Sequence, residues 1–175
     1  MSPTESVVST LQRNWAMVDS ALEDLDQETI NRIPMEQCNS IAWILWHMSR
    51  VVDTFINTRF QSQPQLWIAG GWHRRFGMGD DPDDRGVGWT MEQVASWRPP
   101  DLSVLLGYHQ AVRVAAGEYL SSATEADLAE VKVIAPVPEP RTVANALGQM
   151  VWDAVAHGGQ IAYLRGFYRG MGWHR

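Results

Sequence analysis

The chain has little positive charge and a single cysteine. Its 14 Lys and Arg residues are outnumbered by 20 Asp and Glu residues, which gives a formal net charge of −6. Because nucleic-acid binding depends on clustered Lys and Arg, this balance argues against nucleic acid as a partner. Cys38 is the only cysteine, so an internal disulfide is impossible and nothing points to an oxidising compartment.

Long apolar runs are missing as well. No run approaches the roughly 18 residues that span a bilayer, and the opening residues lack the basic start and apolar core of a signal peptide. We therefore expect a cytoplasmic protein with no membrane partner that acts on small molecules. A length of 175 residues suits one domain of ordinary size, so we expect a single domain over residues 1–175.

The sequence also lacks the alternation that is typical of strands. Apolar residues recur instead at steps of three and four, which indicates amphipathic helices. Long helices are expected over about residues 4–25, from Asn39 or Ser40 to about Phe55, over 101–120 and over 142–169. Short helices are expected after Thr90, which has capping-box spacing to Gln93, and after Thr124. The pattern predicts an all-α four-helix bundle without a sheet.

Residues 61–89, after the second long helix, break the helical pattern. This stretch contains several glycines, two prolines and a charged cluster. Loops of this length inside a compact domain are usually functional or disordered, and four aromatic residues favour an ordered loop. They are Trp67, Trp72, Phe76 and Trp89. We predict that this loop covers the functional site.

Asp153 and His157 are four residues apart on the last expected helix. At this spacing two side chains share a face, with Cβ atoms roughly 5–6 Å apart, so both can bind one metal ion. We expect His157 well inside the apolar face and Asp153 near its edge. The third ligand would come from His47 or His109, and spacing alone does not choose between them. Two imidazoles and one carboxylate leave coordination positions open, as in catalytic sites.

The residues beside this pair carry further expectations. Two glycines inside a helix, here Gly158 and Gly159, cost about 1 kcal/mol each relative to Ala, so a neighbouring helix or a ligand should approach closely there. Gln160 is one turn beyond His157 and either orients a ligand or is a half-exposed polar residue. His73, in the loop, is expected to face solvent or a substrate.

Three segments together resemble the DinB/YfiT-like metal-binding four-helix bundles: residues 40–48, 69–77 and 157–166. The usual ligands of that family are a His in the second helix and two His, four residues apart, in the last. The matching positions here are His47, Asp153 and His157. The carboxylate at position 153 resembles the variant in mycothiol-dependent maleylpyruvate isomerases. The resemblance thus implies one divalent ion, zinc or nickel, with His109 not bound to it.

The same resemblance implies a thiol-dependent S-transferase or isomerase with a low-molecular-weight thiol as co-substrate, similar to bacillithiol and mycothiol S-transferases. A metal-dependent hydrolase and a non-catalytic bundle that binds metal or a small ligand are the alternatives. Arg74 or Arg75 would pair with a carboxylate on a substrate. The predicted substrate-binding residues are His73, Arg74, Arg75, His109 and Gln160.

We also predict a homodimer. Nine tryptophans in one small chain suggest exposed aromatic side chains, and apolar patches beyond a few hundred Å² usually mark interfaces. The family resemblance points the same way.

Overall fold

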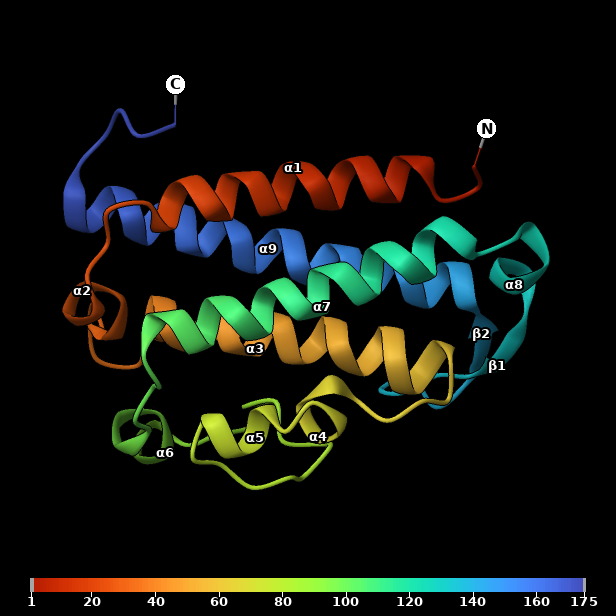
Figure 1. The fold of residues 1–175 in the computed structure, drawn as a ribbon, viewed down its shortest axis with the longest axis horizontal. Helices are drawn as coiled ribbons and strands as arrows, with labels where there is room; N and C mark the ends of the chain where they lie inside the picture. Colours follow the sequence, from red (N-terminus) through yellow and green to blue (C-terminus); the bar gives the residue numbers. More distant parts are fainter. Residues whose placement is uncertain (1, 175) are drawn as a thin grey trace.

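The structure is a computed structural model that describes residues 2–174, and four long helices form its body (Figure 1). They are α1 (Glu5–Leu22), α3 (Ile41–Asp53), α7 (Leu102–Ser122) and α9 (Val143–Arg169). Helix α9 packs against α1 and α3, and α7 packs against α3. The predicted all-α bundle is therefore confirmed. Within residues 2–174, none of the helices is both long and apolar enough to cross a membrane.

Side-chain caps explain why the sequence signals located several helix starts. Ser40 accepts a hydrogen bond from the backbone N–H of Trp43 at 3.2 Å and begins α3. Thr142 caps α9 in the same way. Thr90 and Gln93 form the expected capping box of α6 (Met91–Ser96). A short helix also follows Thr124, namely α8 (Glu125–Ala129).

Three details differ from expectation. The first helix ends at Leu22 rather than near residue 25, because Asp24 has a left-handed φ of 59° and Asp26 caps a separate helix, α2 (Gln27–Asn31). The second long helix continues beyond α3 as a π-helix, η1 (Thr54–Phe60). The expected absence of a sheet is also wrong. Strands β1 (Val131–Val133) and β2 (Pro140–Thr142) pair antiparallel, and segments this short are below the length at which alternation is recognisable.

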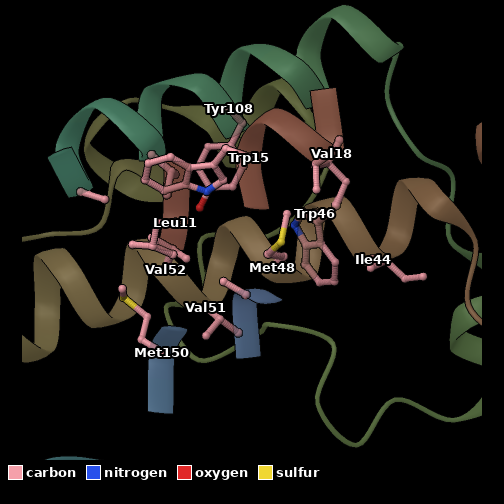
Figure 2. Close-up of a cluster of buried hydrophobic side chains, with 14 of the residues drawn as sticks. Leu11, Trp15, Val18, Ile44, Trp46, Met48, Val51, Val52, Tyr108 and Met150 are labelled. Carbon is pink, nitrogen blue, oxygen red and sulfur yellow. The ribbon is translucent and has the colours of Figure 1, made fainter. Parts of the chain in front are cut away.

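The core lies between the four long helices (Figure 2). Leu11 and Trp15 of α1, Val52 of α3, Tyr108 of α7 and Met150 of α9 are all buried there.

The tryptophans are mostly interior. Trp152, with 69% exposure, is the one largely exposed tryptophan among the described residues. Exposed aromatic side chains are present as expected, namely Trp152, Tyr163 and Phe167, but most of the tryptophans pack in the bundle and under the loop. The homodimer stays a prediction.

Residues 61–89 form an ordered layer beneath α3 and α7 and contain two short helices, α4 (Leu66–Ala69) and α5 (Trp72–Arg75) (Figure 1). Trp67 and Phe76 are buried, and Trp72 and Trp89 are half-buried against the core. The aromatic residues thus hold this loop against the bundle, as their number predicted.

A buried carboxylate attaches the first half of this loop to α3. Asp53 is fully buried. It accepts hydrogen bonds from the backbone N–H groups of Leu66 and Trp67, each at 2.9 Å. It also accepts one from the Tyr108 hydroxyl of α7 at 2.7 Å. One side chain therefore joins α3, α7 and the start of α4.

A buried guanidinium attaches the second half. Arg50, one turn before Asp53, is also fully buried. It donates hydrogen bonds to the backbone carbonyls of Asp81 and Pro82 at 3.2 Å and of Asp84 at 3.1 Å. The segment before Trp89 is thereby held by a charged donor that has no access to water.

We predict that Arg50→Met lowers the free energy of unfolding by about 3–5 kcal/mol, because it leaves a buried carboxylate and several loop carbonyls without their cationic partner. The measurement is urea unfolding followed by far-ultraviolet circular dichroism. Arg113→Met is the matched control. Arg113 pairs with Asp19 at 2.8 Å on the surface, and exposed pairs contribute about 1 kcal/mol or less. Equal losses in the two variants would contradict a special role for Arg50.

Candidate metal centre

His47 is held in one orientation by the loop and by its own helix. Its Nδ1 lies 2.5 Å from the backbone oxygen of Arg85. Because a carbonyl only accepts, Nδ1 carries the proton and Nε2 keeps its lone pair. Trp43, one turn earlier on α3, stacks on the imidazole with ring centroids 4.9 Å apart and an interplanar angle of 5°. The metal-binding tautomer is thus already selected.

His157 has the same arrangement on α9. Its Nδ1 lies 2.8 Å from the backbone oxygen of Asp153, so Nε2 is again the free nitrogen. The His47 and His157 rings approach to 4.6 Å between centroids. The side chains of Asp153 and His157 are each 19% exposed. The expectation that His157 lies deeper than Asp153 is therefore wrong; both sit at the edge of the α3–α9 seam.

Asp153 provides the clearest indication of a cation site. Its Oδ1 is buried and has no hydrogen-bond partner, with His157 Nδ1 at 3.4 Å. This carboxylate oxygen is therefore held by one long contact only, and it keeps lone pairs that a cation can use. One ligand atom from each of His47, Asp153 and His157 can be chosen so that all lie within 4.8 Å of one another. Among the described residues this is the one group that could hold a metal ion.

The two imidazoles have opposite pKa shifts in the metal-free protein. Burial, reinforced by the nearby His157, lowers the pKa of His47 even though the Arg85 carbonyl opposes the shift. Burial also lowers the pKa of His157, but the Asp153 carboxylate outweighs it and the net shift is upward. His47 therefore keeps the neutral form that a metal requires, and a proton goes to His157 first.

His109 lies elsewhere. It is 3% exposed, and its Nδ1 is 2.9 Å from Oγ of Ser49. Ser49 is two residues beyond His47, so it points to the opposite side of α3, toward α7. Burial, together with the nearby Arg113, lowers the pKa of His109 to about 3. The alternative that spacing left open, His109 in place of His47, is not supported by this placement.

We refer to His47, Asp153 and His157 as the cluster. The loop residues predicted to bind substrate do not gather around it. His73 is buried, with its Nδ1 2.9 Å from the backbone oxygen of Trp67, so the expectation of a solvent-facing side chain is wrong. The Arg75 guanidinium lies over Trp72 at 4.4 Å. Trp67 and Trp72 both pack on Tyr108 of α7, so these loop residues lie on the side of α3 that faces α7.

Unlike His73, the side chains of Arg74 and Arg75 on α5 and of Gln160 on α9 are exposed. Gln160 alone among the predicted substrate-binding residues shares a helix with Asp153 and His157.

Two contributions to the site escaped sequence reasoning. The first is the Arg85 carbonyl, since a backbone atom has no sequence signal. Gly86 follows it, with φ of 79°, and a Cβ there would lie 2.5 Å from Cζ2 of Trp43. The glycine therefore lets the loop approach His47 closely.

The second is Asn14 of α1, which explains one of the two helix glycines. A Cβ at Gly158 would lie 2.1 Å from Asn14 Oδ1, while Asn14 Nδ2 donates to the backbone oxygen of Ala154 at 3.0 Å. A neighbouring helix thus accounts for Gly158, as expected. It does not account for Gly159, around whose Cβ position there is no atom within 4 Å.

Comparison with known proteins agrees with the helical bundle. The family model of the DinB superfamily matches residues 10–161. The crystal structure of a conserved protein from Enterococcus faecalis is similar, with a TM-score of 0.85 and 26% sequence identity over 98% of this chain and 99% of that one. No curated protein matches the chain.

We predict that Gly86→Ala weakens the attachment of the loop to His47, because the new methyl group would overlap Trp43. Gly88→Ala is the matched control: Gly88 also has positive φ, 78°, but nothing lies within 4 Å of its Cβ position. Both variants incur about 1 kcal/mol of backbone strain, and Gly86→Ala should lose at least about 1–3 kcal/mol more through overpacking. Chemical unfolding measures the difference, and identical stabilities would rule out the close contact.

We also predict that His109 makes the metal-free protein acid-sensitive. The unfolded chain binds a proton at this residue below its ordinary pKa of 6.5, whereas the folded chain does so only near pH 3. Stability is therefore lost as the pH falls between these values, by about 2 kcal/mol on going from pH 7 to pH 5. His109→Gln should lose about 2 kcal/mol less than the wild type over this interval in urea unfolding. His174→Gln, at an exposed position, should behave like the wild type.

Proposed function

The chain belongs to the DinB superfamily, and from this membership we propose that it binds one divalent metal ion through His47, Asp153 and His157 and acts there on small molecules. The observation that carries the proposal is that ligand atoms of His47, Asp153 and His157 lie within 4.8 Å of one another, while the buried Asp153 Oδ1 has no contact closer than His157 Nδ1 at 3.4 Å.

The donor set suits zinc or nickel, because neutral imidazole nitrogens with one carboxylate are ligands that both ions accept. The Arg85 and Asp153 carbonyls orient the two rings, as the outer partners of metal-bound histidines generally do. Three protein ligands leave coordination positions for a substrate. When bound, such an ion supplies Lewis-acid stabilisation of a thiolate.

We further propose that the reaction is a thiol-dependent S-transfer or isomerisation. The surroundings of the cluster support a reaction on a small molecule. His47 is 5% exposed and covered by Trp43 and the loop backbone, which excludes water on that side. Asp153 and His157 keep 19% of their side chains exposed, so a thiol and its electrophilic partner would reach the cluster from the α9 side.

Metal analysis of single variants tests the site. We predict that the wild type takes up one zinc or nickel ion per chain after repletion and dialysis. Replacing His47, Asp153 or His157 by Ala should remove most of it, whereas His109→Ala should retain it because that imidazole lies on the other side of α3. Inductively coupled plasma mass spectrometry gives the occupancy. Full occupancy in His47→Ala, or a wild type that binds none of zinc, nickel and manganese, would refute the site.

The same proteins then report on the reaction. With mycothiol or bacillithiol and 1-chloro-2,4-dinitrobenzene, a sulfur–carbon bond forms, chloride leaves with the electron pair of the broken bond, and the thiol proton passes to solvent. The metal-loaded wild type should accelerate this conjugation, and His47→Ala should not. Metal binding without acceleration would leave the site standing and reject the thiol-transfer role. Metal-dependent ester hydrolysis instead would favour the hydrolase alternative.

A further inference from the structure

A groove of about 600 Å³ lies beside the cluster, between the second half of α9 and the connection from α2 to α3. Much of its wall is apolar, including Met35, Ile44, Ala156, Leu164 and Phe167. The volume falls within the roughly 300–1,000 Å³ of small-molecule sites.

The groove adjoins the predicted metal ligands along both helices. Ile44 is one turn before His47 on α3, and Gln160 is one turn after His157 on α9. Because one turn rises about 5 Å, a molecule in the groove would have its near end within reach of the cluster. The three cluster residues do not line the groove themselves, but Ala156 of its wall is next to His157 in sequence, and Asp153 and His157 keep exposed edges on the same helix.

Among residues 2–174 the lining carries no Asp, Glu, Lys or Arg; its polar side chains are Cys38, Asn39, Gln160 and Tyr163. An anionic ligand would therefore lose its hydration there without gaining a cation. This argues against Arg74 or Arg75 holding a substrate carboxylate at this place. The groove suits an uncharged molecule with a large apolar part and a few hydrogen-bonding groups.

A glycine inside α9, Gly159, forms part of the groove wall. Glycine inside a helix costs about 1 kcal/mol relative to Ala. Apart from its chain neighbours and the backbone of its own helix, no atom of the described residues lies within 4 Å of the position that a Cβ of residue 159 would take. Packing explains Gly158, through Asn14, but not its neighbour. Gly159 lines the groove, and the missing side chain keeps that wall open.

We propose that this groove binds the apolar body of a neutral electrophile, the second substrate of the thiol-dependent reaction, and presents its reactive end to the cluster. The inference rests on the proposed function for the role of the ligand. The neutral apolar class of the ligand follows from the groove alone.

The test uses N-phenyl-1-naphthylamine, a neutral fluorophore, with the full-length metal-loaded protein. The wild type should bind it with saturable enhancement of fluorescence, and 1-chloro-2,4-dinitrobenzene should displace it. Gly159→Leu adds a side chain to the groove wall at a position whose Cβ site is open, and it should weaken binding at least tenfold. Gly148→Leu is the matched control, since Gly148 is on α9, also has nothing within 4 Å of its Cβ position, and lies outside the groove. It should bind like the wild type.

Metal occupancy, measured on the same samples, separates this inference from the proposed function. Both Leu variants should keep the wild-type metal content, because neither touches a ligand. If the wild type did not bind the fluorophore, or if Gly159→Leu bound it as tightly as the wild type, the groove would not be the ligand site. A wild-type dimer that dissociates on Gly159→Leu in light scattering would also overturn the inference, since a second copy would then be the occupant. Probe binding by a protein that takes up no metal would overturn the co-substrate role and support the ligand class.

Discussion

The buried Arg50 and Asp53 side chains on α3 hold the long loop in place, and the loop in turn orients the His47 imidazole. Both residues are fully buried, and their hydrogen bonds go mainly to loop backbone rather than to each other, their closest N···O distance being 4.0 Å. Charged groups removed from water need such partners. The loop that supplies them continues directly to Arg85, whose carbonyl fixes the proton of His47 on Nδ1. Two buried charged side chains thereby help to fix the tautomer of His47, which lies one turn before Arg50 on α3.

In the cluster, both imidazoles are oriented by hydrogen bonds, whereas one oxygen of the Asp153 carboxylate accepts none. His47 is oriented by the loop carbonyl and by stacking on Trp43, and His157 by a carbonyl of its own helix. Asp153 has no equivalent partner for Oδ1. Two oriented imidazoles and a carboxylate, with ligand atoms within 4.8 Å of one another, form a group that could hold a divalent cation, and this is the physical basis of the proposed function.

Access to this cluster is one-sided. The loop was expected to cover the site, and its Arg85–Gly86 end does contact His47 and Trp43. Its His73–Arg75 part packs instead toward Tyr108 and α7. The open side runs along α9, where the groove beside Gly159 begins. The loop therefore forms a wall on one side of His47, and the small-molecule binding that we propose belongs to the groove between α9 and the connection from α2 to α3.

The bundle, its main helix starts and the Asp153–His157 pair were predictable from sequence, because helical periodicity, caps and the four-residue spacing are local properties. Choosing His47 over His109 was not, since both lie on apolar helix faces and only the packing of α3 between α7 and α9 separates them. The burial of His73, the Arg85 carbonyl and the different reasons for Gly158 and Gly159 also depend on contacts between distant segments. The sequence by itself determined which residues could bind a metal; the tertiary structure decided which of them meet, because that depends on which side of α3 each neighbouring helix occupies.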